Sequence, residues 1–146
     1  MPTVNLNDVA AARFQTRDKG VILSFHVLIV DDNAGIRHAI RSLIERETQH
    51  HVCGEAENGE IAVARVKELH PDVVILDMQM PVMNGLEAAR EISQLSPDTA
   101  MVMVTMHCSE QLRKDARAVG IMDVVSKHNA IADGLLASLG RVCVRP

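Results

Sequence analysis

Short apolar runs alternate with longer segments of helical period along most of the chain. From residue 26 onward, five such runs predict β-strands: HVLIVDD (26–32), HVCGEAE (51–57), DVVILDM (72–78), AMVMVTM (100–106) and MDVVSKH (122–128). The first, third and fourth runs are apolar throughout, as expected for strands that helices cover on both faces. The second and fifth are more mixed, and we expect them near the edges of the sheet.

The segments between these runs carry apolar residues at helical spacing. Four stripes stand out: Ile36, Ile40, Leu43 and Ile44; Ala62, Val63, Val66 and Leu69; Leu86, Ala89, Ile92 and Leu95; and Ile131, Leu135, Leu136 and Leu139. Ser109 and Asn129 are expected to cap the last two helices, and Asn58–Gly59 is expected to form a turn. Alternating strands and helices are typical of βα units around a parallel sheet, which predicts an α/β fold.

Residues 1–25 do not follow this alternation. Three interpretations remain open for them: a short helix around Asp8–Phe14, a tail, or a misassigned translational start. A chain of 146 residues with 47% hydrophobic content is the right size for one domain with a core. We therefore expect an N-terminal extension of unknown role (1–25), one domain (26–141) and a C-terminal tail or the start of a linker (142–146).

Composition excludes several classes of function. The formal net charge is −4 and no Lys/Arg cluster occurs, so direct binding of nucleic acid is not expected. No apolar run approaches the ~18 residues of a membrane span, and the N-terminus lacks a signal-peptide pattern, which favours a cytoplasmic protein. Three cysteines without a CxxC spacing are typical of reduced thiols.

Chemically active residues end four of the five predicted strands. Asp31 and Asp32 end the first, Asp77 the third, Thr105 the fourth and Lys127 the fifth. Because the carboxyl ends of parallel strands meet at one edge of the sheet, we expect these side chains to converge there. Asp31–Asp32 has a plainer interpretation as a helix cap, Asp77 and Lys127 as solvated charges, and Thr105 as an ordinary strand residue.

Three clustered carboxylates need a cation, and oxygen ligands favour a hard ion such as Mg²⁺. A carboxylate is also a nucleophile that can form an aspartyl-phosphate, whose oxygens need a metal ion, an ammonium group and a hydroxyl nearby. Asp77, Lys127 and Thr105 supply such a set.

The motifs VLIVDD, GEAENGEIAV, VVILDMQMPVMNGLEAAREI, MVMVT and SK occur in this order. In this respect the chain resembles the receiver domains of bacterial two-component response regulators. The segment PVMNGLEAAREI is most similar to the subfamily that usually carries a C-terminal helix-turn-helix output domain. The resemblance implies a flavodoxin-like, doubly wound α/β fold with five parallel strands in the order 2-1-3-4-5 and five helices.

The resemblance also implies a role for each matching residue. Asp77 would be the phosphoacceptor, while Asp31, Asp32, Asp77 and the backbone carbonyl of Gln79 would hold Mg²⁺. Thr105 would be the switch hydroxyl and Lys127 the lysine that pairs with the phosphoryl group. The phosphodonor would be a sensor histidine kinase, and a homodimer or an output domain would receive the signal. The chain would be a signalling domain and not an enzyme in its own right.

The chain departs from the family pattern at three positions. Val124 replaces the usual aromatic residue, His128 replaces the proline that commonly follows the lysine, and Met106 is bulkier than the small residue expected there. These departures leave open a scaffold that binds partners without being phosphorylated. An enzyme on a related fold fits less well. A phosphatase would need a second Asp where Gln79 stands, and Asp31–Asp32 would repel a flavin phosphate.

Three further expectations concern side chains outside the motifs. Ala130, Gly134, Ala137 and Ser138 would give the last helix a small-residue face on which a partner or a second copy docks, with weak surface selection as the alternative. The methionines from 78 to 106 are expected to fill the core. His50, His51, His107 and His128 are expected at the surface, with no metal bound by His107, Cys108 and His128.

Overall fold

The computed structural model describes residues 14–17, 20–128 and 130–143. Within these ranges, five strands form a parallel sheet: β3 (His26–Val30), β4 (His51–Ala56), β5 (Val73–Asp77), β6 (Ala100–Thr105) and β7 (Asp123–Ser126). Their order across the sheet is β4-β3-β5-β6-β7. Counted from β3, this is the predicted order 2-1-3-4-5, and the two mixed runs form the edges as expected.

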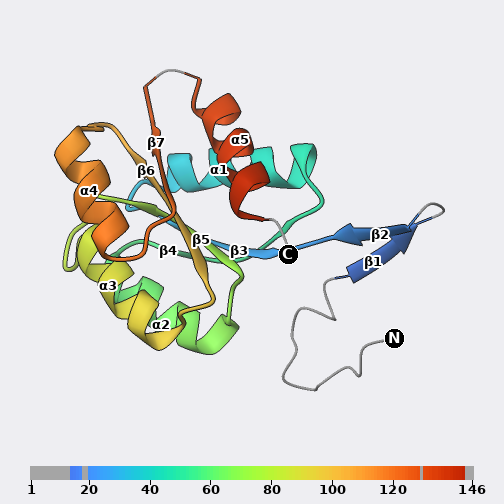
Figure 1. The fold of residues 1–146 in the computed structure, drawn as a ribbon, viewed down its shortest axis with the longest axis horizontal. Coiled ribbons are helices and arrows are strands. Elements are labelled where there is room, and N and C mark those ends of the chain that lie inside the picture. The colour runs from blue at the N-terminus through green and yellow to red at the C-terminus, as the bar shows by residue number, and fades with distance from the viewer. Residues whose placement is uncertain (1–13, 18–19, 129, 144–146) are drawn as a thin grey trace.

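Helices cover both faces of this sheet (Figure 1). In the described part of the chain they are α1 (Ala34–Glu47), α2 (Gly59–Leu69), α3 (Gly85–Leu95), α4 (Glu110–Ala118) and α5 (Ile131–Val142). One core layer lies between the sheet and α2, α3 and α4, and the other between the sheet and α1 and α5. The fold is therefore the doubly wound, flavodoxin-like arrangement that the sequence predicts.

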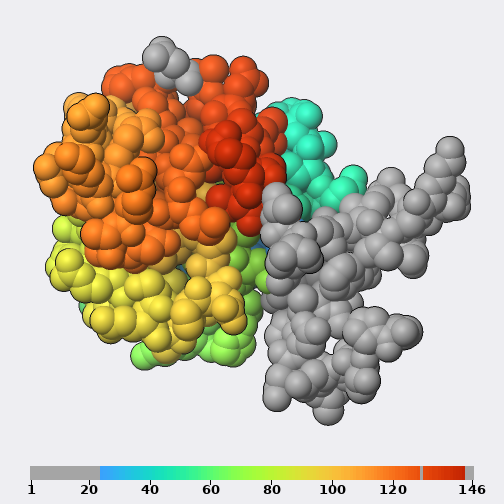
Figure 2. Space-filling view, viewed as in Figure 1, coloured from blue at the N-terminus to red at the C-terminus, as the bar shows by residue number. Residues whose placement is uncertain are grey.

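The central strands supply both core layers, because successive side chains of a strand point to opposite faces. On β3, Leu28 and Val30 belong to the layer beneath α2 and α3, while Val27 and Ile29 belong to the layer beneath α1 and α5. All four are at most 1% exposed. In the space-filling view, α3, α4 and α5 form most of one face of the domain (Figure 2).

Asparagine or serine side chains cap the N-termini of the first four of these helices. The Asn33 side chain accepts a hydrogen bond from the backbone N–H of Ile36. The side chains of Asn58 and Ser109 likewise accept from the backbone N–H of the residue three positions later. The cap of α1 is thus Asn33, which makes the interpretation of Asp31–Asp32 as the cap wrong. The turn predicted at Asn58–Gly59 lies one residue earlier: the chain bends at Glu57 and Asn58, Asn58 caps α2, and Gly59 is its first residue. Ser109 caps α4 as predicted.

The start of α5 differs from the prediction. Asn129 lies outside the described residues, and the N-cap position is held by Ala130 in a left-handed conformation (φ +47°). The small-residue face expected on this helix is only partly exposed: Ala130 and Ala137 are exposed, whereas Gly134 and Ser138 are turned toward the sheet. Ser138 is fully buried, and a Cβ atom at Gly134 would lie 3.0 Å from Val125 Cγ1. Gly134 and Ser138 therefore let α5 approach the sheet.

Residues before β3 form an element that the sequence pattern did not predict. β1 (Phe14–Arg17) and β2 (Gly20–Leu23) pair antiparallel as a separate hairpin that projects from the domain (Figure 1). The helix expected around residues 8–14 falls largely outside the described residues. Phe14, its last residue, begins a strand, so the helix prediction is wrong at that position.

Several smaller expectations are tested by burial. Met101 and Met103 fill the core, but Met106 is 45% exposed, against expectation. His51, His107 and His128 are exposed, while His50 is half-buried. Within the described residues, Cys53, Cys108 and Cys143 form no disulfide, in agreement with the expected reduced thiols. No helix in the described part of the chain is long and apolar enough to cross a membrane.

Candidate functional site

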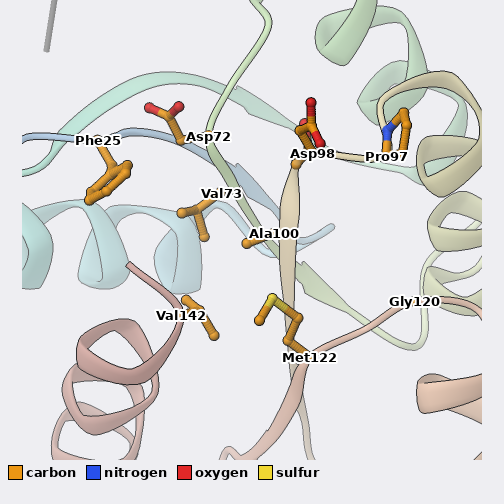
Figure 3. Close-up of a pocket in the computed structure, with 10 residues that line it drawn as sticks. Phe25, Asp72, Val73, Pro97, Asp98, Ala100, Gly120, Met122 and Val142 are labelled. Atoms are coloured by element: carbon orange, nitrogen blue, oxygen red, sulfur yellow. The ribbon is translucent and has the colours of Figure 1, made fainter. Parts of the chain in front are cut away.

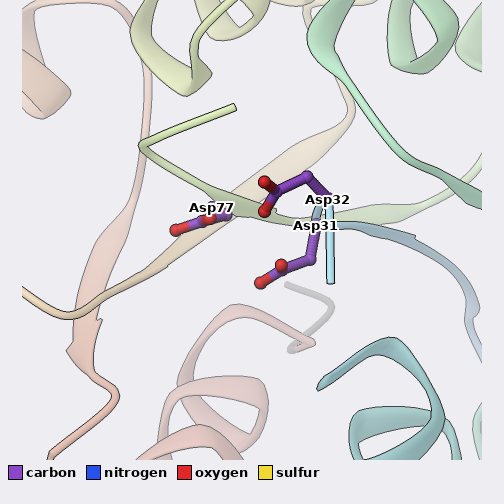
Figure 4. A group of neighbouring side chains, drawn as sticks. All are labelled: Asp31, Asp32 and Asp77. Atoms are coloured by element: carbon purple, nitrogen blue, oxygen red, sulfur yellow. The ribbon is translucent and has the colours of Figure 1, made fainter. Parts of the chain in front are cut away.

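Three carboxylates from two neighbouring strands meet at the carboxyl edge of the sheet. Asp31 and Asp32 directly follow β3, and Asp77 is the last residue of β5. One carboxylate oxygen from each lies within 4.8 Å of the others, the single such group of His, Cys, Asp or Glu side chains among the described residues. All three carboxylates point into the same space (Figure 4). Asp31 and Asp77 are 2% and 7% exposed, whereas Asp32 is exposed.

An ammonium group bridges two of these acids. Lys127 Nζ lies 2.7 Å from Asp31 Oδ2 and 3.2 Å from Asp77 Oδ1. Burial alone would lower the pKa of Lys127, but the hydrogen bond and charge of Asp31, and then Asp77, raise it above its ordinary value. Burial and the neighbouring charge of Asp31 raise the pKa of Asp77, and Lys127 opposes this only in part. The single ammonium group of Lys127 therefore does not neutralise the three carboxylates.

The remaining predicted site residues lie around the same cavity. It has a volume of about 410 Å³ and is lined by Asp31, Asp32, Asn33, Ile36, Asp77, Gln79, Thr105, Met106 and Lys127. Thr105 is 3% exposed, and its hydroxyl accepts the backbone N–H of His107 at 3.3 Å. The backbone N–H of Lys127 donates to the Thr105 carbonyl at 2.8 Å, which ties the ends of β6 and β7 together.

The loop after Asp77 is held close to the acid by a glycine. The Gly85 N–H donates to the Met78 carbonyl at 2.8 Å, and a Cβ atom at Gly85 would lie 2.2 Å from the Asp77 carbonyl oxygen. Asn84 and Glu87 close a capping box at the same point, so α3 begins directly against the Asp77 backbone. Gly85 was not among the residues predicted from the sequence, although the Asn84-Gly85 pair before an apolar stripe is a visible signal.

A network of arginines beside the acids was also missed. Arg37 Nη1 donates to the Asp31 carbonyl at 2.7 Å, and Arg37 Nε donates to Glu55 Oε1 at 2.9 Å. Arg41 holds the other oxygen of Glu55 at 2.8 Å. Burial would raise the pKa of Glu55, but hydrogen bonds from Arg41 and Arg37 lower it. From the sequence alone, Arg37 and Arg41 are expected to face solvent, because their partner Glu55 lies on a strand that is distant in the sequence.

A second cavity lies at the opposite end of the sheet, where the strands begin. It has a volume of about 310 Å³ and is bordered by Phe25, Val73, Ala100, Met122 and Val142, with Asp72 and Asp98 at its rim (Figure 3). It carries neither the ammonium group nor the clustered acids of the first cavity. The phosphoacceptor, metal-ligand and switch residues predicted from the sequence all line the first cavity.

The donor set of the first cavity fits a hard divalent cation. Carboxylates and a backbone carbonyl are the ligands that Mg²⁺ takes in proteins, usually together with waters and a phosphate. One of the three acids is exposed, which gives such an ion access from solvent. Asp31, Asp32 and Asp77 would hold the ion, and the exposed residue Gln79 lies on the same cavity.

Comparisons with known proteins agree with this fold. The model of the response regulator receiver domain matches residues 27–138. The transcriptional regulatory protein YdfI of Bacillus subtilis is 39% identical over 94 residues, which cover 64% of this chain and 44% of YdfI. The chain therefore spans less than half the length of this relative.

Solved structures show the same relationship. The response regulator domain of Thermotoga maritima CheB aligns with a TM-score of 0.77 and 30% identity, over 84% of this chain and 99% of that domain. A chain of the CheX-CheY-BeF₃-Mg²⁺ complex from Borrelia burgdorferi aligns with a TM-score of 0.76 and 28% identity, over 83% and 90% of the two chains. With the family match extending over most of the domain, this chain belongs to the response regulator receiver domain family.

Proposed function

We propose that the chain accepts a phosphoryl group on Asp77 from a phosphohistidine of a sensor kinase and thereby switches a protein-contact surface or an output domain. The observation that carries this proposal is the meeting of three carboxylates within 4.8 Å, with Lys127 Nζ on two of them. Of the three acids, Asp77 lies on the central strand β5 and is buried beside the ammonium group.

The chemistry assigns a role to each side chain around the acceptor. An Asp77 carboxylate oxygen attacks the phosphorus atom, the phosphorus–nitrogen bond breaks, and the released imidazole nitrogen takes a proton. Mg²⁺, held by Asp31, Asp32, Asp77 and the carbonyl of Gln79, would neutralise charge that builds on the phosphoryl oxygens. Lys127 remains protonated, because its pKa is raised, and pairs with one of those oxygens.

Thr105 would report the modification. Its hydroxyl already accepts a hydrogen bond from the His107 N–H, and accepting a bond leaves the hydroxyl proton for a phosphoryl oxygen. Movement of Thr105 and Lys127 toward the acceptor would shift α4 and α5 between two populations. The shifted surface would be read by a second copy, another protein or an output domain, and a cytoplasmic location follows from the proposed donor.

The complete set of acids, hydroxyl and ammonium group favours this function over a scaffold that is never phosphorylated. A scaffold needs no desolvated acid beside another acid, an arrangement that costs stability. Burial and the charge of Asp31 nevertheless raise the pKa of Asp77. A carboxylate whose pKa is perturbed in this way is typical of sites that perform chemistry.

The test uses acetyl phosphate in the presence of Mg²⁺. Intact-protein mass spectrometry should show one added phosphoryl group on the wild type and none on Asp77→Asn. Asp98→Asn is the matched control, because Asp98 is an exposed acid at the opposite end of the sheet. Equal labelling of the wild type and Asp77→Asn, or no labelling of the wild type, would contradict the proposal.

A further inference from the structure

We infer that Arg37 is a positioning residue for the metal site: it fixes the Asp31–Asp32 peptide and thereby the direction of both carboxylates. The inference rests on the proposed function, since it concerns the same acids. Arg37 contributes no oxygen ligand and does not line the cavity of the acids. It acts on the backbone behind them.

Asp31 is hydrogen-bonded at four points. Its N–H donates to the Ala56 carbonyl at 3.1 Å, and its two carboxylate oxygens accept from the Asn33 N–H at 2.9 Å and from Lys127 Nζ at 2.7 Å. The fourth point is its carbonyl, which accepts from Arg37 Nη1 at 2.7 Å. This carbonyl belongs to the peptide that joins Asp31 to Asp32, so Arg37 determines how that peptide is turned.

The orientation of that peptide matters most for Asp32. Asp31 is buried and held by its neighbours, whereas Asp32 is exposed and lies just beyond the end of β3. The direction of the Asp32 side chain therefore depends on the backbone that precedes it. Groups that orient metal ligands from behind are typically worth 10- to 100-fold in metal affinity.

Arg37 can perform this task because it is itself immobilised. Its side chain is 17% exposed, and Nε donates to Glu55 Oε1 at 2.9 Å. Glu55 lies on β4 and is held from the other side by Arg41, one helical turn after Arg37 on α1. The planar guanidinium of Arg37 thus joins a fixed carboxylate on β4 to the Asp31 carbonyl, a geometry that the single nitrogen of lysine cannot reproduce.

Two other roles for Arg37 make different predictions. If Arg37 acted only through its charge, its removal would leave a more negative site and tighter Mg²⁺ binding. If it acted only on stability, its removal would leave the affinity of the folded protein unchanged. Only a positioning role predicts weaker Mg²⁺ binding after a positive charge has been taken away.

The experiment measures Mg²⁺ affinity by isothermal titration calorimetry, with Mn²⁺ paramagnetic resonance as an independent readout. Arg37→Met should bind Mg²⁺ about 10-fold more weakly than the wild type, and Arg37→Lys should fall between the two. Arg41→Met is the matched control: it removes the same charge from the same carboxylate but leaves the contact to Asp31, so its affinity should be no weaker than that of the wild type. Circular dichroism before each titration ensures that folded protein is compared.

The outcomes separate this inference from the proposed function. Undiminished affinity in Arg37→Met, or an equal loss in Arg37→Met and Arg41→Met, would overturn the positioning role while a wild type that is labelled on Asp77 keeps the proposed function. A wild type that binds no Mg²⁺ and is not labelled would overturn both. If Arg37→Met does not fold, the comparison of Arg37→Lys with Arg41→Met decides by the same criteria.

Discussion

Replacing Lys127 with methionine should destabilise the protein strongly, because it leaves two buried acids without their counter-charge. Lys127 Nζ lies 2.7 Å from Asp31 and 3.2 Å from Asp77, which corresponds to gross attractions of about 6 and about 5 kcal/mol at an effective dielectric near 20. The cost of burying the ammonium group offsets part of this. Breaking a buried pair by removing one partner typically costs about 3–5 kcal/mol.

We therefore expect Lys127→Met to lose about 3–5 kcal/mol of unfolding free energy at neutral pH without Mg²⁺, and to lower Tm by on the order of 10 °C. The chain has no Trp and no Tyr, so urea unfolding is best followed by far-UV circular dichroism. Lys114→Met is the matched control, because Lys114 is exposed on α4 and should change stability by less than about 0.5 kcal/mol.

The pH dependence tests the electrostatic cause. The pKa of Lys127 is raised in the folded state, so its stabilising effect is present below the ordinary lysine pKa and disappears as pH rises through the raised value. On the acid side, the deficit of Lys127→Met should shrink as the Asp77 carboxylate, whose pKa is raised, takes up a proton. A deficit below about 1 kcal/mol, or one that stays constant from neutral to acid pH, would refute this reasoning.

Three further perturbations test the loops around Asp77. Gly85→Ala should lower the free energy of unfolding in urea by about 3 kcal/mol or more, because its Cβ would lie 2.2 Å from the Asp77 carbonyl oxygen. A loss below about 1 kcal/mol would mean that α3 moves away from the Asp77 backbone freely. Val82 has φ +70° and is 74% exposed, so Val82→Gly should gain about 1 kcal/mol; Val82→Ala is the control, and an equal gain in both variants would show that the backbone is not the cause. Met106 lines both the acidic cavity and the neighbouring cavity beside His107 and Cys108. Met106→Ala should therefore speed labelling by acetyl phosphate several-fold, as followed over time by mass spectrometry. An unchanged rate would show that Met106 does not restrict access to Asp77.

Much of the fold could be predicted from the sequence, because each buried strand is visible as a short, continuous apolar run. A strand covered on both faces must be apolar throughout, and DVVILDM and AMVMVTM show this pattern. The strand order came from the resemblance, since periodicity alone does not fix it. The convergence of Asp31, Asp77 and Lys127 followed from a general property of parallel sheets.

The features that sequence reasoning missed depend on contacts between distant segments. The pairing of Arg37 with Glu55 joins α1 to β4, and nothing in the local pattern of either segment marks it. The direction of the small residues on α5 was misjudged because a small side chain suits both a close internal contact and an exposed surface. Gly134 and Ser138 lie on the internal side. The hairpin of β1 and β2 was missed because its second strand runs almost directly into β3.

The backbone hydrogen bond between Lys127 and Thr105 has a consequence for communication with the outside of the domain. Because this bond fastens the end of β6 to the first residue after β7, a ligand that displaces either segment also repositions the other. Under the proposed phosphorylation of Asp77, linkage requires that any partner preferring the phosphorylated arrangement also makes phosphorylation more favourable, by the same coupling free energy. A downstream target can therefore act as a co-activator of the domain that recruits it.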